Sequence, residues 1–427
     1  MPPSSGAAMA KSFSGPTNCC RVGIEKIAAY PCSLSLDLEE LARVRGHDVA
    51  DLRENLLVRS RGLNPLWEDP VTMAVNAAKP MLTEEDCASI ELLIVATESS
   101  VDQGKPITTF AQRYLGVNAN CRNFEAKHGC YAGTSSMMLA AHWVASGLAK
   151  DAKALVITSD QSRMHLRKPY EYVMGAGSVA ILMSNQPRVL EFELEKNGYW
   201  TNEVSDTFRP TSKVEAGNTD VSVYSYLDAL QGAYAHYVQK AGGDVDFDGS
   251  FKKNIYHVPF GGMTFLAHRT LLRQWKHLKK SVAHEHFAQK VLPGLKYTSQ
   301  LGGTYSSSTF LSLMGLLDSC EDLEAGDRLG IFSYGSGCCG EFYSARVCPE
   351  AKDVVAKARL QELIDARQPL SVDEYEKLEQ QRYGLIDCGD FEPKTDGLHD
   401  VFKKRYERNG YLILKGVAGH FREYGWS

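Results

Sequence analysis

Residues 123–136, with the sequence NFEAKHGCYAGTSS, decide how this chain of 427 residues is organised. One cysteine, Cys130, stands between Gly129 and Gly133, and an apolar run typical of a helix follows it. A thiol at a helix N-terminus meets unpaired N–H groups and the positive end of the helix dipole, so we expect a lowered pKa for Cys130. The glycines allow a tight turn and close approach of a substrate. Cys130 is therefore a candidate nucleophile, although cysteine is also among the most buried residue types.

The composition excludes several classes of protein. The apolar fraction of 44% is typical of a globular protein with a substantial core, and the net charge of −5 gives no sign of nucleic-acid binding. Eleven cysteines are too sparse for a disulfide scaffold and lack the spacing of metal ligands, so we predict no metal and a reducing cytoplasm. No apolar run is long enough to span a bilayer. Residues 1–18 resemble neither a signal peptide nor a folded element and are predicted to be a disordered leader.

Short apolar runs alternate with helical patterns along the first half of the chain. Residues 21–29, 92–96, 154–158 and 179–183 are expected to be strands, because they are short and rich in branched side chains. Residues 36–45 and 70–82 have helical spacing. Toward the C-terminus, residues 351–381 are expected to be helical and residues 411–414 to form a late edge strand.

The second half repeats this order. A strand at 255–260 is followed by a glycine-led run at 302–308, an apolar helix and a strand at 329–333. Strand alternating with helix predicts mostly parallel sheets covered on both faces, and chemistry at the carboxyl ends of their strands. Glu98 and His257 both follow a strand, so a duplicated α/β unit would bring them to Cys130 in one crevice. We expect the halves to comprise residues 19–190 and 191–427.

Five motifs, in order along the chain, together resemble 3-hydroxy-3-methylglutaryl-CoA synthases. They are the Glu98 loop, GCYAGT at 129–134, DTFRP at 206–210, HVPF at 257–260 and FSYGSG at 332–337. The resemblance implies an α/β protein with the thiolase-like fold, a duplicated five-layered αβαβα body. The stretches EDPVT at 68–72, VNAAKP at 75–80, GYW at 198–200 and YSYLDAL at 224–230 look like the branch that installs β-branches during polyketide assembly. That branch takes acyl groups from acyl carrier proteins.

The resemblance also implies roles for individual residues. Cys130 would be the acylated nucleophile, Glu98 the general acid/base, and His257 the group that positions and polarises the acceptor. We expect a raised pKa for Glu98, because it must work in a poorly solvated site. Ser336 would help to orient the bound acyl group. The other substrate-binding residues would be Gly335 and Tyr334 of the last motif and Phe208 and Arg209 of the DTFRP motif.

Three positions depart from the family pattern. Gly261-Gly262 stand where coenzyme-A-using members commonly have a lysine, which fits a substrate without the nucleotide of free coenzyme A. Gly303 stands where many relatives have asparagine, and Met164 where bacterial relatives often have tyrosine, so both polar contacts are missing.

Three alternative functions remain open from the sequence. One is the coenzyme-A-dependent enzyme of isoprenoid synthesis, which the Gly261-Gly262 pair disfavours. Another is a ketosynthase of the same fold, which Glu98 disfavours. A third is a non-catalytic scaffold that binds carrier proteins.

The predicted partners are acyl carrier proteins for both donor and acceptor, and a second copy of the chain in a homodimer. No cofactor is expected beyond the phosphopantetheine arm that carries the substrates. Because carrier proteins are typically acidic, we predict that one contacts either Arg209 or the basic segment 268–296. That segment holds a single acidic residue and seven basic ones, namely Arg269, Arg273, Lys276, Lys279, Lys280, Lys290 and Lys296.

Overall fold

The computed structural model describes residues 21–148, 151–243, 245–276 and 280–427. The predicted leader, residues 1–18, lies outside the described residues, as does Lys279 of the basic segment. Within the described ranges, no helix is both long and apolar enough to cross a membrane.

Ten strands are joined by hydrogen bonds through the centre of the molecule, and β9 (Gly198–Thr201) pairs with β14 off the main path. The other nine lie in the order β12 (Lys253–Tyr256), β13 (Arg328–Gly335), β14 (Cys339–Val347), β8 (Leu190–Phe192), β1 (Gly23–Tyr30), β7 (Ala176–Ser184), β6 (Lys153–Gln161), β4 (Ile90–Ala96) and β5 (Arg122–Ala126).

This strand order confirms the duplication. Outward from the centre, one side runs β1, β7, β6, β4 and the other β8, β14, β13, β12. Corresponding pairs of neighbouring strands in the two halves also have the same relative orientation. The pairs β1–β7 and β8–β14 are antiparallel, as are β7–β6 and β14–β13, whereas β6–β4 and β13–β12 are parallel. The end of β4, which precedes Glu98, therefore corresponds to the end of β12, which precedes His257.

The prediction of mostly parallel sheets is wrong, because only β4–β5, β4–β6 and β12–β13 are parallel pairs within the central sheet of the described chain. The connection from β13 to β14 is the clearest reason. Only three residues separate Gly335 from Cys339, whereas a parallel crossover needs about a dozen or more. The alternation of strand and helix in the sequence could not reveal the direction of these returning strands.

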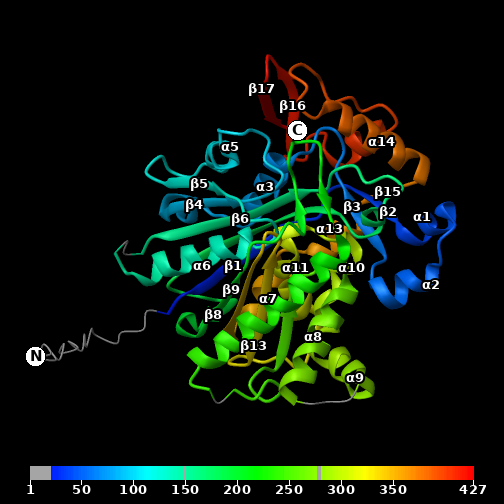
Figure 1. The fold of residues 1–427 in the computed structure, drawn as a ribbon. Coiled ribbons are helices and arrows are strands. Elements are labelled where there is room, and N and C mark those ends of the chain that lie inside the picture. Colours follow the sequence, from blue (N-terminus) through cyan, green and yellow to red (C-terminus); the bar gives the residue numbers. More distant parts are fainter. Residues whose placement is uncertain (1–20, 149–150, 244, 277–279) are drawn as a thin grey trace, which may run out of the picture.

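The helices complete five layers, which confirms the expected architecture (Figure 1). Helices α6 (Ala132–Ala145) and α11 (Ser308–Ser319) form the middle layer, with α3 (Pro70–Ala78) and α5 (Ile107–Leu115) outside one half-sheet and α7 (Thr219–Lys240) and α8 (Gly261–Lys276) outside the other. Neighbouring strand residues face opposite layers. Ile94 packs in the central cluster, whereas Leu93 packs in the outer cluster with α3. Ile331 and Phe332 divide in the same way in the second half.

Shorter elements cover the edges of the body. The helical elements are α1 (Leu38–Arg45), α2 (Val49–Asp51), η1 (Leu52–Leu56), η2 (Lys79–Met81), α4 (Glu84–Ser89), η3 (Pro169–Tyr172), η4 (Leu194–Lys196), α9 (Lys280–Lys290), η5 (Leu292–Lys296), α10 (Thr298–Leu301), η6 (Tyr305–Ser307), α12 (Ala351–Lys357), α13 (Leu360–Asp365), α14 (Val372–Leu385) and α15 (His399–Arg405). The minor strands are β2 (Leu34–Asp37), β3 (Ser60–Leu63) and β15 (Gln368–Leu370), which form one small sheet, and the pair β10 (Thr207–Phe208) and β11 (Ala216–Gly217).

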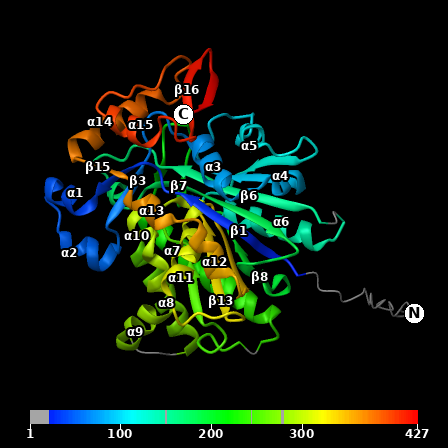
Figure 2. The same ribbon diagram turned by 180° about the vertical axis from the view of Figure 1, so that it is seen from behind.

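The C-terminal tail folds back on the first half, as seen from behind in Figure 2. Its helices confirm the predicted helical tail. The predicted late strand is β16 (Leu412–Ala418), which pairs with β17 (Phe421–Trp426) in a separate hairpin. The main-chain N–H and carbonyl of Leu412 each form a hydrogen bond with the side-chain amide of Asn76 in α3. Tyr424 and Arg422 both contact the Asp69 carboxylate at the start of that helix.

The middle layer should dominate stability. We expect Phe310→Ala in α11 to lower the free energy of unfolding by about 3–5 kcal/mol, because the ring is 1% exposed between both sheets and truncation leaves a cavity. Denaturant unfolding checks this, with Phe421→Ala as the matched control, since that ring is 83% exposed and its loss should cost no more than about 0.5 kcal/mol. Equal losses in the two variants would contradict the layered core.

Candidate active site

Cys130 lies on a sharp turn between β5 and α6. Gly129 has φ +46°, and a Cβ there would lie only 3.2 Å from the backbone nitrogen of Ser336, which follows β13 of the other half. The Ser306 hydroxyl also donates to the Gly129 carbonyl over 3.3 Å. The loops that carry Cys130 and Ser336 are therefore in direct contact, and the left-handed turn and the tight packing both require glycine at position 129.

The Cys130 thiol has the opposite pKa shift to the one predicted. Burial raises its pKa well above the usual value, and the carboxyl groups of Glu98 and Asp160 raise it further. Helix α6 begins at Ala132, so the thiol does lie next to a helix N-terminus. Desolvation and two neighbouring carboxyl groups outweigh the helix dipole here. The expectation of a lowered pKa is therefore wrong, and the resting sulfur is a thiol.

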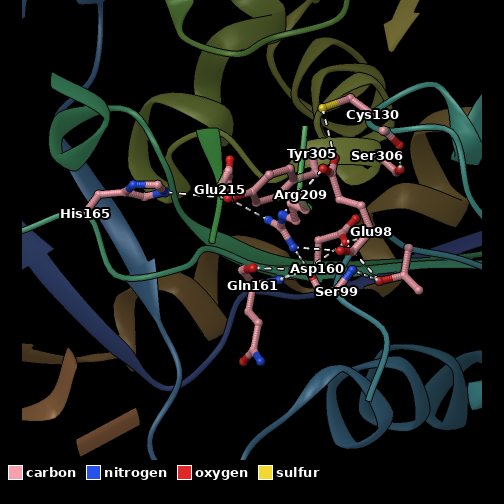
Figure 3. Close-up of polar contacts among 12 residues, drawn as sticks. Glu98, Ser99, Cys130, Asp160, Gln161, His165, Arg209, Glu215, Tyr305 and Ser306 are labelled. Atoms are coloured by element: carbon pink, nitrogen blue, oxygen red, sulfur yellow. Dashed lines mark hydrogen bonds and ion pairs between the residues drawn. The ribbon is translucent and has the colours of Figure 1, made fainter. Parts of the chain in front are cut away.

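Glu98 is the nearest acid to that sulfur. The Cys130 Sγ–H donates to Glu98 Oε1 over 3.5 Å (Figure 3). Burial raises the pKa of Glu98 to about 7, since the carboxyl groups of Asp160 and Glu215 reinforce burial while Arg209 opposes it. This confirms the predicted direction. A carboxyl group with this pKa exchanges protons readily near neutral pH.

Asp160, at the end of β6, fixes the loop that carries Glu98. Its Oδ1 accepts hydrogen bonds from the Thr97 hydroxyl, the Glu98 N–H and the Ser99 hydroxyl, each over 2.9 Å. Three donors on one buried oxygen hold the backbone on both sides of Glu98 in place.

The Arg209 side chain is only 9% exposed and lies beside Glu98 (Figure 3). Its guanidinium donates to the Glu98 backbone carbonyl over 2.7 Å, lies 3.7 Å from Glu98 Oε2, and pairs with Glu215 over 2.9 Å. Burial disfavours ionisation of Glu215, yet Arg209 and His165 hold its pKa at about 2. Arg209 therefore bridges one ionised and one readily protonated carboxyl group. This enclosed position does not suit the predicted contact with a carrier protein.

His257 follows β12 and is almost fully buried, with 2% of its surface exposed. Burial lowers the pKa of its imidazole to about 3, so the ring is neutral. Its Nδ1 lies 2.8 Å from the Ser308 hydroxyl oxygen, which accepts the Val258 N–H over 3.2 Å. Among the described residues, Nδ1 is the acceptor within hydrogen-bond distance of that hydroxyl's own hydrogen, so we assign the ring proton to Nε2. The Tyr226 hydroxyl anchors the same residue by donating to its carbonyl over 2.8 Å.

One cavity of about 260 Å³ joins the predicted residues Glu98, Cys130, His257, Tyr334 and Ser336. Its remaining lining is largely apolar and includes Leu56, Val173, Met174, Val223, Tyr226, Pro259, Phe260, Met263 and Tyr305.

The other three predicted contacts, Gly335, Phe208 and Arg209, lie outside this lining. Gly335 supports it from behind, since a Cβ there would meet the His128 carbonyl at 2.5 Å. Phe208 is 47% exposed on the surface. The Tyr334 hydroxyl lines the cavity but donates to Asp206 over 2.7 Å.

The glycines that depart from the family pattern are sterically required. A Cβ on Gly262 would lie 1.7 Å from the Asn55 carbonyl, and one on Gly261 would lie 2.6 Å from the Leu57 Cβ. A Cβ on Gly303, which lines the cavity, would lie 2.6 Å from the Pro259 carbonyl. The segment after α2 therefore occupies the space beside Gly261-Gly262, and this backbone leaves no room for a side chain at any of these three positions.

Sequence reasoning missed several residues of this site. Asp160 lies two residues after a predicted strand, and Tyr305 and Ser308 lie in the glycine-led run, so their positions offered a signal. Glu215 lies between β10 and β11 in a segment with no pattern, and only the fold brings it to Arg209.

The arrangement suits acyl transfer followed by carbon acid chemistry. A thiol accepts an acyl group, a carboxyl group with a pKa of about 7 lies beside it, and a neutral imidazole offers an N–H in the same poorly solvated cavity.

Comparison with known proteins agrees with this geometry. The models for the N-terminal and C-terminal parts of hydroxymethylglutaryl-coenzyme A synthase match residues 19–187 and 271–424. The chain is 37% identical, over 95% of its length and 99% of the relative's, to the polyketide biosynthesis 3-hydroxy-3-methylglutaryl-ACP synthase PksG of Bacillus subtilis. It is 30% identical to a hydroxymethylglutaryl-CoA synthase of Enterococcus faecalis, over 84% of this chain and 91% of that relative.

Solved structures point the same way. The HMG synthase of the curacin biosynthetic pathway, solved in complex with holo donor-ACP, superposes with a TM-score of 0.91 at 38% identity. The match covers 95% of this chain and 100% of that one.

The Glu98 carboxylate should suppress the reactivity of Cys130. We expect Glu98→Gln to speed alkylation of Cys130 by iodoacetamide at pH 7.5, because it removes the negative charge that raises the pKa of the thiol. The rate should rise roughly tenfold for each unit by which that pKa falls. Peptide mass spectrometry measures the rate. Glu203→Gln, in an exposed loop, is the control and should react like the unchanged protein. Slower alkylation in Glu98→Gln would instead make Glu98 the base that activates the thiol.

Proposed function

This chain belongs to the hydroxymethylglutaryl-coenzyme A synthase family, and we propose that it is the carrier-protein-dependent 3-hydroxy-3-methylglutaryl synthase of a polyketide β-branching pathway. The contact that carries the proposal is the 3.5 Å approach of Glu98 to Cys130 in a cavity shared with His257. The 37% identity to a polyketide biosynthesis 3-hydroxy-3-methylglutaryl-ACP synthase supports the pathway, and the complex of the curacin HMG synthase with donor-ACP supports the partner.

The first step loads the enzyme. The Cys130 sulfur attacks the thioester carbonyl of an acetyl group carried on phosphopantetheine, and the carrier's thiol leaves as the new thioester forms. The proton of the Cys130 thiol passes to the departing carrier thiolate, so this thiol–thioester exchange does not require Glu98 as a base. Covalent capture splits one difficult condensation into separate steps.

The second step forms the carbon–carbon bond. The Glu98 carboxylate removes a proton from the acetyl methyl group, and the resulting enolate carbon attacks the β-ketone of the acceptor. The neutral His257 donates a hydrogen bond from Nε2 to the ketone oxygen as it becomes an alkoxide. The proton that Glu98 removed from the methyl group balances the one that the alkoxide gains. Backbone N–H groups near Cys130 and Ser336 are the proposed donors to the enolate oxygen.

The last step is hydrolysis. Water adds to the thioester at Cys130, the carbon–sulfur bond breaks, and the product leaves with a free carboxylate while the thiol is regenerated. No cofactor takes part in this proposal other than the phosphopantetheine arms that bring the two substrates.

The packing beside Gly261-Gly262 favours a carrier protein over free coenzyme A. Gly261 and Gly262, which stand where coenzyme-A-using members have a lysine, pack against residues 55–57 and leave no room for a charged side chain. One positive charge that would meet the nucleotide of coenzyme A is therefore missing. Turnover of acetyl-CoA and acetoacetyl-CoA as efficient as that of the carrier-bound substrates would favour the isoprenoid-type enzyme. The ketosynthase alternative is disfavoured by Glu98, which lies where an enolate-forming base is needed.

The basic segment 268–296 is less open to a partner than its composition suggests. Lys276, Lys290 and Lys296 form ion pairs with Asp246, Asp248 and Asp318 from neighbouring elements. Arg269 and Arg273 have no ion pair with a described residue, and they remain the segment's candidates for an acidic carrier protein. A homodimer and a cytoplasmic location stay predictions.

Acyl transfer tests the roles of Cys130 and Glu98 separately. After incubation with acetyl carrier protein, intact mass should show one acetyl group on the unchanged protein and on Glu98→Gln, and none on Cys130→Ala. Only the unchanged protein should convert a carrier-bound β-ketoacyl thioester, because Glu98→Gln lacks the base.

The donor comparison completes that experiment. Acetyl transfer from carrier protein should be faster than from acetyl-CoA. A faster reaction with acetyl-CoA would support the coenzyme-A-dependent alternative, and the absence of any adduct on Cys130 would support the non-catalytic scaffold.

Arg209 should set the pH dependence of condensation. Activity should rise with pH as Glu98 ionises, with a midpoint near pH 7. Arg209→Met removes the positive charge that lowers the Glu98 pKa, so the midpoint should move about 1–3 units higher, while Arg209→Lys should shift it less. Rates measured from pH 5 to 9 check this, and a midpoint that is unchanged in Arg209→Met would contradict it.

A further inference from the structure

Arg163, in the loop after β6, is a buried cation without a partner among the described residues. Only 7% of the residue is exposed, and its Nε is buried with no hydrogen-bond partner. No hydrogen bond or ion pair joins its guanidinium to any residue that the structure describes. An enclosed charge is costly unless something pairs with it, so this guanidinium is built to meet a negative group.

Arg163 lines a polar pocket of about 110 Å³ on the far side of the Glu98 loop. The pocket shares no lining residue with the catalytic cavity. Its walls come from that loop, from the β3–α3 connection and from the C-terminal tail, and they include Asn64, Glu68, Asp69, Ser99, Ser100, Gln103, Gln161, Ser212, Arg382, Leu385, Asp387 and Arg422.

The other charged groups of the pocket already have partners. Arg422 pairs with Asp69 over 3.2 Å, and Arg382 pairs with Glu379 over 2.5 Å. The Glu68 carboxylate accepts from the hydroxyls of Tyr30 and Tyr406, and Asp387 accepts from Ser212 at the rim. Arg163 is thus the lining cation left to bind a ligand, and Arg382 adds a second positive charge beside it.

The size of the pocket limits the ligand. A volume of about 110 Å³ holds roughly three or four water molecules, which is far below the 300 Å³ or more typical of a nucleotide-sized ligand. The planar, fork-shaped guanidinium suits two oxygens of one anion. We propose that this pocket is a binding site for a small oxyanion, either inorganic phosphate or a short carboxylate, held by Arg163.

Ser99 links the pocket to the catalytic network. Ser99 lines the pocket, and its hydroxyl donates to Asp160 over 2.9 Å and accepts from Arg209 over 3.0 Å. Arg163 and Arg209 are also close enough to repel each other electrostatically, so the charge of an anion at Arg163 opposes the field that Arg209 exerts on Glu98. The site does not depend on the proposed reaction, since it rests on groups outside the catalytic cavity.

Thermal unfolding of the full chain tests the binding. Sodium phosphate and sodium acetate are each titrated against sodium chloride at matched ionic strength and pH. At least one of them should raise the melting temperature saturably, and Arg163→Gln should weaken the apparent affinity at least tenfold. Arg43→Gln, which removes an exposed arginine of α1, is the matched control and should respond like the unchanged protein. A response to phosphate alone or to acetate alone identifies the class of anion.

A second measurement does not depend on how the variant folds. Crystals of the unchanged protein grown with selenate should show an anomalous peak within hydrogen-bond distance of the Arg163 guanidinium. The proposal is overturned if neither anion stabilises the protein beyond chloride, or if Arg163→Gln binds the anion as tightly as the unchanged protein. It is also overturned if the Asp387 carboxylate pairs with the Arg163 guanidinium in the crystal and no anomalous peak appears there.

Discussion

The contact between the Cys130 thiol and the Glu98 carboxyl group is the interaction on which this site depends. Both groups lie in surroundings that disfavour charge, so the thiol stays protonated and the carboxyl group has a pKa of about 7. Arg209 prevents a further rise, because it holds the Glu98 backbone on one side and the ionised Glu215 on the other. At neutral pH the thiol therefore stays protonated, while the Glu98 carboxyl group beside it can readily take up or release a proton.

The duplicated fold brings a third residue, His257, to this pair. Corresponding strands β4 and β12 end at Glu98 and His257, while the turn before α6 meets the turn after β13 at Gly129 and Ser336. The first half thus carries Cys130 and Glu98, the proposed nucleophile and base, and the second half carries the neutral imidazole of His257. Because α6 and α11 share one buried middle layer, the two halves cannot separate without exposing the main core.

Much of this could be predicted from the sequence, for identifiable reasons. Apolar runs marked the strands, and Glu98, Cys130 and His257 each stood beside a predicted element, so their convergence followed from the repeat. Strand direction could not be inferred, because a three-residue connection such as that between β13 and β14 leaves no pattern. The sign of the Cys130 pKa shift was also missed. It depends on Glu98 and Asp160, which are distant in sequence, and on burial that the local motif does not show. Glu215 and Arg163 likewise gain their surroundings only in the folded chain.

The most direct test of the central claim is exchange of the methyl protons of acetyl-Cys130 in deuterium oxide, followed by mass spectrometry in the absence of any acceptor. If Glu98 forms the enolate in this cavity, the acetyl group should gain deuterium in the unchanged protein and remain unlabelled in Glu98→Gln. Exchange at the same rate in both proteins would show that another group removes the proton, and would contradict the assignment of Glu98 as the base.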